Sequence, residues 1–422
     1  MRSVTVLADD LTGANDTALQ FYKNGHATKV SVRACSIVPE SEGVKVINAE
    51  TRSASRMEAA EKTSKWTGEI SNHDTILYKK IDSTMRGHIG AEVDAILTSG
   101  DYDLAVIAPS YPENGRTISK GIQYVNGIPL HQTQFAGDPR FPISTSRIDS
   151  LLEQQSRFRV RHISSETLLT RRHIHEEIES AEREGFRILT FDCQSQEELD
   201  HLVEAGLKAV SKVVFVGSAG LAKSLACRIE TGHTTCCSHL KPDDFQKALG
   251  LVGSLNDTSR TQVQFARDNG IPVIEIDPSD LLLNTPADLM KKQESEYKNS
   301  SLHLFVVSAV SDRPEELNAF TPDEVGSRIA NQLGKLGSFL MESGHYQLVY
   351  LTGGDIAFET CRSANIDLLT IAGELEEGIP VCKVTSGPYK GVHIITKAGG
   401  FGSKETIFRV KQTLMNSRGI SK

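Results

Sequence analysis

Short apolar runs alternate along this chain with longer segments whose apolar residues recur every three or four positions. Short runs are typical of buried strands, and the longer spacing is typical of amphipathic helices. In the first half the runs lie at residues 4–8, 44–48, 75–81, 104–110, 186–193 and 212–216. Helical segments follow the first strand up to Gly25, and lie at 57–70, 90–100 and 218–226. This alternation predicts a mostly parallel sheet that is covered on both faces.

The second half repeats the pattern, with apolar runs at residues 248–252, 271–276, 302–308, 347–351 and 392–396. Residues 229–246 between the halves are polar and lack periodicity, and the 422 residues exceed what one hydrophobic core usually fills. We therefore expect an α/β protein with two domains, each a mostly parallel sheet flanked by helices. The expected boundaries are 1–230 and 247–422, with a linker at 231–246. Residues 111–130, rich in Gly, Pro and Asn, are expected to form a loop.

Three glycine turns in the second half each connect a predicted strand to a helical segment. They are GSLN at 253–256, TGGD at 352–355 and KAGGFG at 397–402. Such a turn points free backbone N–H groups beyond the strand end, where the helix N-terminus attracts phosphate. Any α/β domain needs some glycine turns, but three together favour a nucleotide site at the carboxyl ends of the strands.

Two acidic residues end the first predicted strand. Asp9 and Asp10 precede a Thr-Gly-Ala turn, and paired carboxylates at that edge suit hydroxyl recognition, proton abstraction or magnesium coordination. Capping of the following helix explains one of them equally well. Arg52, just past the second predicted strand, is expected to converge on the same edge of a parallel sheet.

A second polar cluster, KIDSTMRGH, runs from residue 80 to residue 88 at the end of another strand. Lys80 and Arg86 can hold a carboxylate, and the guanidinium offers a two-pronged fork. Asp82 can accept hydrogen bonds from substrate hydroxyls. A charged loop with Ser83 or Thr84 as helix cap is the alternative.

Residues 217–224, GSAGLAKS, are one residue short of the P-loop pattern that binds nucleotide phosphates. They follow a strand and open a helix, as that motif requires. Ala222 stands where the motif needs glycine, and no strand ending in a suitable Asp accompanies it. We therefore do not expect a standard P-loop enzyme.

Composition excludes several classes of protein. The net charge of −8 argues against general nucleic-acid binding, and no apolar run is long enough to span a membrane. Seven cysteines without framework spacing, and an N-terminus unlike a signal peptide, fit a cytoplasmic protein. Cys236 and Cys237, near His233 and His239, lack the usual zinc spacing, so no metal site is predicted.

Six segments, in this order, resemble the four-carbon acid sugar kinase family: VLADDLTGANDTA, KKIDSTMRGHIGAE, VGSAGLA, VGSLN, LTGGDIA and ITKAGGFG. The resemblance covers nearly the whole chain. It implies an N-terminal acid-sugar-binding domain and a C-terminal nucleotide-binding domain, with the active site in the crevice between them. The implied reaction transfers the γ-phosphoryl group of ATP to the 4-hydroxyl of a four-carbon acid. The KIDSTMRG form is most similar to threonate and erythronate kinases, so D-threonate is expected first, D-erythronate second and 3-oxo-tetronate as an alternative.

The resemblance assigns residues to the two ligands. The acid sugar takes Asp9, Asp10, Arg52, Lys80, Ile81, Asp82, Ser83, Thr84 and Arg86, with Asp9, Asp10 and Asp82 as candidates for orienting or deprotonating the hydroxyl. ATP takes Ser254, Thr352, Gly353, Gly354, Asp355, Gly399 and Gly400. Lys397 is added as a candidate for neutralising phosphate charge, with a simple exposed lysine as the equal alternative. Mg²⁺ is expected with ATP, and Asp355 is one candidate partner for it.

Two other functional classes remain at this stage. A sensor could bind an acid sugar and a nucleotide without transfer, although intact acids and glycine turns argue against it. A dinucleotide-dependent oxidoreductase would need G-x-G-x-x-G after its first strand, and the sequence lacks it. The oligomeric state is not predicted.

Overall fold

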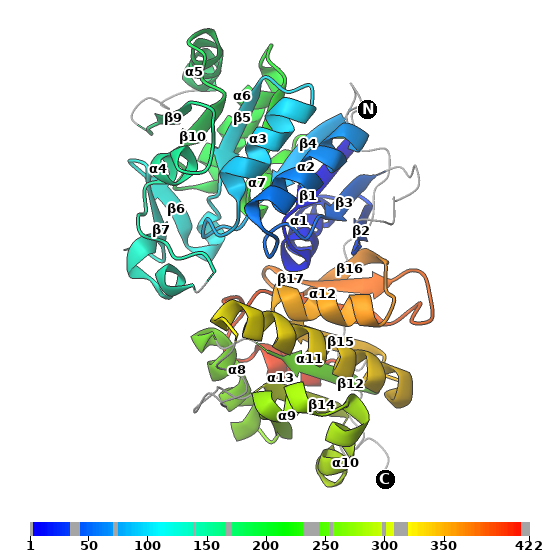
Figure 1. Cartoon of the computed structure of the whole chain (residues 1–422). Helices are drawn as coiled ribbons and strands as arrows, with labels where there is room; N and C mark the ends of the chain where they lie inside the picture. Colours follow the sequence, from blue (N-terminus) through cyan, green and yellow to red (C-terminus); the bar gives the residue numbers. More distant parts are fainter. Residues whose placement is uncertain are drawn as a thin grey trace. The chain divides into compact units, whose positions relative to one another are not determined.

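The computed structural model divides the chain into two compact units. Unit 1 comprises Met1–Thr28 and Val38–Thr235, and unit 2 comprises Lys29–Ile37 and Cys236–Lys422. The structure describes residues 3–33, 43–70, 75–138, 140–165, 171–230, 245–253, 256–297, 301–307 and 320–414. Both units are α/β, as the alternation of apolar runs predicted (Figure 1).

Unit 1 is built on a sheet whose strands run parallel in the order β3-β1-β4-β11-β5-β10-β9. The strands are β1 (Ser3–Ala8), β3 (Val44–Asn48), β4 (Thr75–Lys80), β5 (Leu104–Ala108), β9 (Val160–Ile163), β10 (Ile188–Phe191) and β11 (Val213–Gly217). The helices are α1 (Leu11–Lys23), α2 (Arg56–Ile70), α3 (Ile89–Ser99), α4 (Ile148–Glu153), α5 (Arg171–Arg183), α6 (Gln196–Lys208) and α7 (Ala219–Ala226).

The helices of unit 1 fall into two groups. Helix α2 packs against α3, whereas α1, α7, α6 and α5 pack in a row. The chain leaves β1 towards β3 and then crosses back over β1 to β4. Right-handed crossovers in opposite directions place α1 and α2 on opposite faces of the sheet. Burial of the strands on both faces follows, and β5 is buried at every position.

Residues 111–130 do not form the loop that their composition predicted. They contain a short turn η1 (Pro112–Asn114) and a small antiparallel sheet of β6 (Arg116–Ser119), β7 (Ile122–Val125) and β8 (Ile128–Pro129), followed by η2 (Leu130–Gln132) and η3 (Gln134–Gly137). The two hairpin loops are the pairs Lys120-Gly121 and Asn126-Gly127, and all four residues have positive φ between 52° and 78°. That backbone suits a two-residue hairpin, so Asn-Gly was a strand-pairing signal rather than a loop signal.

Unit 2 has the strand order β13-β14-β12-β15-β18-β17-β16-β2. Its strands are β2 (Thr28–Ser31), β12 (Ala248–Val252), β13 (Val273–Ile276), β14 (Leu302–Val307), β15 (Leu348–Thr352), β16 (Leu368–Glu376), β17 (Ile379–Val384) and β18 (His393–Lys397). Its helices are α8 (Asp257–Asp268), α9 (Pro278–Leu283), α10 (Pro286–Tyr297), α11 (Pro322–Gly344), α12 (Gly354–Ser363) and α13 (Thr406–Gln412).

The first five strands of this order are parallel, and the remaining pairs β18–β17, β17–β16 and β16–β2 are antiparallel. The apolar runs did not predict the hairpin β16–β17, strand β2 or, in unit 1, strand β9. Strand β2 comes from the N-terminal part of the chain, yet residues 29–31 pair with β16 in unit 2.

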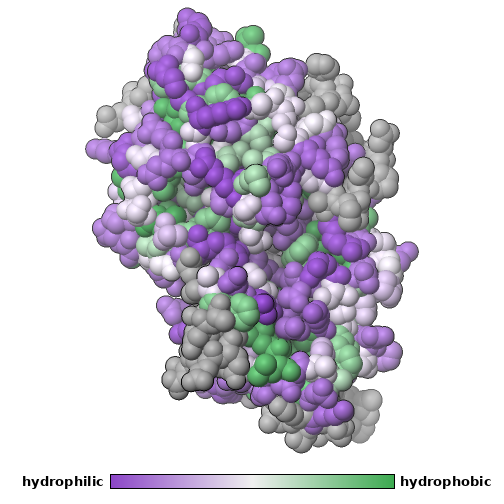
Figure 2. All heavy atoms as spheres, viewed as in Figure 1, coloured by the Kyte–Doolittle hydropathy of each residue, from purple (hydrophilic) through white to green (hydrophobic). Residues whose placement is uncertain are grey.

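The visible surface is mostly hydrophilic, with apolar residues in small groups (Figure 2). Among the described residues the large exposed apolar side chains are Met57, Ile128, Val210 and Leu283, which belong to four separate segments. No helix in the described ranges combines the length and apolarity needed to cross a membrane.

Candidate active site

The polar residues of unit 1 follow strands that end at one level. Ala8 of β1 is in register with Asn48 of β3 and Lys80 of β4, and Lys80 is in register with Gly217 of β11. The chain leaves β1 towards β3 and leaves β4 in the opposite direction, towards β5. The carboxyl ends of β1 and β4 therefore form the topological switch point, where open α/β sheets bind ligands.

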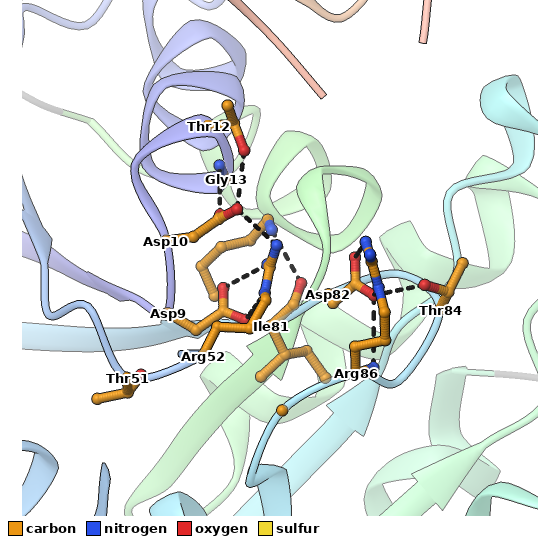
Figure 3. Close-up of polar contacts among 12 residues, drawn as sticks. Asp9, Asp10, Thr12, Gly13, Thr51, Arg52, Ile81, Asp82, Thr84 and Arg86 are labelled. Atoms are coloured by element: carbon orange, nitrogen blue, oxygen red, sulfur yellow. Dashed lines mark hydrogen bonds and ion pairs between the residues drawn. The ribbon is translucent and has the colours of Figure 1, made fainter. Parts of the chain in front are cut away.

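Arg52 ties together the two carboxylates that follow β1 (Figure 3). Its Nε and Nη2 donate to the two carboxylate oxygens of Asp9 at 2.8 and 2.9 Å, and its Nη1 donates to Oδ2 of Asp10 at 2.5 Å. The backbone N–H groups of Thr51 and Arg52 both donate to the carbonyl of Asp9. The convergence that the parallel sheet predicted for Arg52 is thus present in the structure.

Asp10 also caps helix α1, which confirms the capping alternative for this residue, and its role in ligand binding stays a prediction. Its Oδ1 accepts from the N–H of Gly13 at 2.7 Å, and its Oδ2 accepts from the Thr12 hydroxyl at 2.8 Å. Lys80 lies close by, buried, with Nζ donating to the carbonyl of Ile81 at 2.9 Å. A Cβ at Gly13 would stand 2.6 Å from both Lys80 Nζ and Asp10 Oδ1, so this glycine is required for the approach.

Asp82 holds the segment after β4 together by accepting hydrogen bonds from residues of the same segment. The Asp82 carboxylate accepts from Arg86 Nε at 2.7 Å and Nη2 at 3.3 Å, and from the Thr84 hydroxyl (Figure 3). Met85 has φ +60° while buried, a left-handed conformation that costs about 1–3 kcal/mol for such a side chain. Strain of this kind persists only where the surrounding contacts fix the loop.

The small sheet of unit 1 supplies some of those contacts. Gln123 of β7 donates from its amide to the carbonyl of Ser83, and Asp138, after η3, accepts from Arg86 Nη1 at 3.4 Å. The Arg86 guanidinium also lies 5.8 Å from the Phe135 ring centre. Gln123 was not predicted because residues 111–130 were expected to form a loop, and nothing in the sequence singled out Asp138. The two hairpin turns could have indicated the strands, but not the distant segment that these residues contact.

Charges in unit 1 compensate one another. Burial alone would raise the pKa of Asp9, but Arg52, Lys80 and Lys79 outweigh it, and the pKa is lowered. Burial would likewise raise the pKa of Asp82, yet the charges of Arg86 and Arg52 hold it well below its usual range. The pKa of Arg52 is raised well above its usual value, because Asp10 and Asp9 outweigh its burial. The carboxylates of Asp9 and Asp82 are therefore ionised at neutral pH.

A buried ion pair adjoins the charged residues that follow β1, β3 and β4. Lys79 Nζ lies 2.5 Å from Glu92 Oε2 of α3, and both side chains are almost fully buried. The same oxygen accepts from the Thr51 hydroxyl at 2.7 Å. Glu92 thereby connects the residue before Lys80 with the residue before Arg52. Removing one member of such a pair leaves an uncompensated buried charge.

The glycine turns of unit 2 also begin at one level. Val252, Thr352 and Lys397, the last residues of β12, β15 and β18, are direct register partners. The chain leaves β12 towards β13 and leaves β15 in the opposite direction, so these two strands flank a switch point. Gly353 has φ +105° and donates from its N–H to the carbonyl of Lys397. Gly354 and Asp355 begin helix α12.

The other residues assigned to ATP differ in their burial and in their contacts. Gly399 and Gly400 lie in the half-exposed loop after β18. Lys397 is fully buried, and its Nζ donates to the carbonyls of Ala398 and Gly399 at 3.1 and 2.9 Å. Burial lowers the pKa of Lys397 to about 7. Ser254 lies outside the described residues, as do Cys236, Cys237, His233 and His239.

The incomplete P-loop pattern belongs to the packing of unit 1. Ser218 caps α7, and a Cβ at Gly220 would stand 2.5 Å from the carbonyl of Ser110. Lys223, at the position of the phosphate-binding lysine, forms an ion pair with Glu113. The glycine here allows helix α7 to pack closely against the chain that follows β5, and the lysine is already paired.

Comparison with known proteins covers both units. The model of a sugar-binding N-terminal domain matches residues 4–225, and that of a nucleotide-binding C-terminal domain matches residues 249–407. A D-threonate kinase of Salmonella typhimurium is 31% identical over 95% of this chain and 96% of its own length. The chain belongs to the four-carbon acid sugar kinase family. It is therefore an enzyme of the kinase class.

Other members of the family align over similar lengths. A D-threonate kinase of Bordetella bronchiseptica is 28% identical over 98% of both chains, and a D-erythronate kinase of Heliobacterium modesticaldum is 25% identical over 96% and 95%. The crystal structure of a Salmonella typhimurium protein, 23% identical, covers 98% of this chain and 100% of its own with a TM-score of 0.78. That likeness is one of fold.

Gly13→Ala tests the close approach of Lys80 to helix α1. The added methyl group must displace Lys80 Nζ or the Asp10 carboxylate, so we expect kcat/KM for the acid sugar to fall about 10- to 100-fold. The KM for the nucleotide should stay unchanged. Gly68→Ala is the matched control, because Gly68 lies in α2 with nothing within 4 Å of its added Cβ. Steady-state kinetics of both variants measure this, and equal kinetics for the two would contradict the assignment.

Proposed function

We propose that this protein is a D-threonate kinase, which transfers the γ-phosphoryl group of ATP to the 4-hydroxyl of D-threonate. The observation that carries the proposal is that two different sets of groups lie at the two topological switch points. Carboxylates and guanidinium groups gather at the strand ends of unit 1, and glycine turns gather at those of unit 2. Relatives named D-threonate kinase, 28% to 31% identical along the whole chain, support this substrate.

The acid sugar is assigned to unit 1. Arg86 suits its carboxylate, because the guanidinium is held at Nε by Asp82 and its side chain is partly exposed. Asp82 suits a sugar hydroxyl. Within the described residues, its Oδ1 accepts one hydrogen bond, a long one of 3.3 Å from Arg86 Nη2. Arg52 holds Asp9 and Asp10 in place as further acceptors.

The reaction needs orientation of the hydroxyl more than a strong base. Phosphoryl transfer passes through a loose transition state, and catalysis rests on positioning and on stabilising charge. Asp9 and Asp82 have lowered pKa values, so they stay ionised and act as hydrogen-bond acceptors across the neutral range. Transfer also requires the acid sugar on unit 1 and the nucleotide on unit 2 to come together during turnover.

Magnesium is assigned to the nucleotide. No group of three potential metal-ligating side chains occurs within the described part of the chain. Mg²⁺ bound with a nucleotide keeps waters and phosphate oxygens as ligands and needs only one or two carboxylates, so the residues present fit it. Asp355, exposed in the first turn of α12, would hold the ion. When bound, the ion neutralises charge on the phosphates.

ADP release in the presence of ATP and Mg²⁺ tests the proposal directly. The acceptors are D- and L-threonate, D- and L-erythronate and 3-oxo-tetronate, each at matched concentrations. We expect kcat/KM to be highest for D-threonate, with phosphate found on the 4-hydroxyl of the product. Preference for another acid would refute the substrate assignment, and binding of ATP without turnover on any acid would favour the sensor.

Asp82→Asn tests the role of the carboxylate in unit 1. We expect kcat/KM for D-threonate to fall about 100-fold or more, because the amide cannot replace an ionised acceptor. ATP binding should persist. Asp138→Asn is the control, since Asp138 contacts the same Arg86 at 3.4 Å from the other side. Kinetics within threefold of wild type in Asp82→Asn would remove Asp82 from the site.

A further inference from the structure

Lys397 ends the central strand β18 and turns its side chain back into the protein. Its Nζ has four oxygen neighbours: the carbonyls of Gly399 at 2.9 Å, Ala398 at 3.1 Å and Phe401 at 3.3 Å, and the Ser259 hydroxyl at 3.4 Å. An ammonium group has three N–H donors. Four acceptors therefore use all three donors, and the side chain is fully buried. Lys397 thus has no donor left for a phosphate.

The arrangement of these carbonyls fixes the direction of the neighbouring amides. In a trans peptide unit the C=O and the next N–H point in opposite directions, and the described residues contain no cis peptide. Carbonyls 398, 399 and 401 point at Lys397 Nζ, so the N–H groups of Gly399, Gly400 and Gly402 point away from it. No hydrogen bond of these three N–H groups occurs within the described residues.

We propose that Lys397 is a positioning residue, which organises the loop 398–402 into an outward-facing set of N–H donors for the nucleotide phosphates. Successive backbone N–H groups of this kind form anion-binding concavities. The inference rests on the proposed function, because it concerns how ATP is held. It replaces the direct contact between Lys397 and phosphate with an action through the backbone.

Neighbouring elements hold the same loop in place mainly through uncharged groups. Ser259 of α8 donates to the carbonyl of Gly399 at 3.1 Å, and Gln262 of α8 donates to the carbonyl of Phe401 at 3.0 Å. Thr352 of β15, the register partner of Lys397, and Thr406 of α13, which donates to the carbonyl of Ser403, also carry no charge. Glu376 of β16 is the charged group that acts on Lys397, and it is itself paired with Arg409 at 2.8 Å. The loop is therefore braced mainly by neutral contacts around one cation.

The charge state of Lys397 links the loop to pH. Its pKa is lowered by burial to about 7, so the ammonium form is lost as pH rises above 7. Loss of the cation removes the attraction that gathers the carbonyls, and phosphate affinity should weaken. Conversely, phosphates bound to the outward N–H groups favour the gathered, protonated form. Binding of ATP should therefore take up a proton.

Calorimetric titration of ATP into the wild-type enzyme at pH 8, in buffers of different ionisation enthalpy, measures this proton. At that pH the phosphates of ATP are fully ionised, and we expect uptake approaching about one proton per ATP bound. In Lys397→Met the uptake should vanish, and affinity for ATP should fall about tenfold or more while affinity for adenosine changes little. Lys390→Met, at an exposed position of the same unit, should behave as wild type.

A second measurement covers the case in which Lys397→Met does not fold. In wild-type protein labelled with ¹³C at lysine Cε, one resonance should titrate near pH 7 and move to higher pH when ATP is bound. Wild-type protein that binds ATP without proton uptake or any such shift would overturn this inference alone. Wild-type protein that binds no ATP would overturn the proposed function and this inference with it.

Discussion

The parallel pairing of β1 with β3 and β4 is the constraint on which the rest of unit 1 depends. It ends the three strands at one level, so that residues 9, 49 and 81 enter their loops side by side. Arg52 then reaches Asp9 and Asp10 across the sheet edge, and Asp82 lies near enough for its charge to act on Arg52. In unit 2 the same constraint brings together three glycine turns. One structural rule thus produces both candidate ligand sites.

Charge compensation explains why such polar groups can be buried at all. Carboxylates buried without partners would become neutral, because desolvation disfavours the charged form. Here each carboxylate has a cation in contact: Asp9 and Asp10 share Arg52, Asp82 has Arg86, and Glu92 has Lys79. The acids consequently remain acceptors of fixed geometry. That suits a reaction in which a hydroxyl has to be oriented towards a phosphoryl group.

Much of this arrangement could be predicted from the sequence, and the failures have physical causes. Apolar runs located the strands of both parallel sheets except β9, and the parallel topology predicted that Arg52 would meet Asp9 and Asp10. The capping and binding interpretations of Asp10 are compatible, because one carboxylate oxygen accepts from the N–H of Gly13 while the other accepts from Arg52.

The missed features depend on non-local contacts. The hairpins of residues 116–129 contain turn residues that also occur in loops, so the contacts of Gln123 and Asp138 with the segment after β4 could not be foreseen. In the sequence, Lys397 stands at the end of an apolar run, where an exposed lysine is equally common. Only the folded loop shows that its ammonium group is surrounded by carbonyl oxygens. Periodicity locates elements, whereas the partner of a buried charge depends on how distant segments pack.

Separate binding titrations of D-threonate and ATP, in Arg86→Gln and in Gly354→Val, test the central claim most directly. The claim is that the strand ends of unit 1 hold the acid sugar and those of unit 2 hold the nucleotide. It predicts that Arg86→Gln loses D-threonate affinity and keeps ATP affinity, and that Gly354→Val does the reverse. Loss of ATP binding in Arg86→Gln with D-threonate binding intact, or the converse in Gly354→Val, would contradict it.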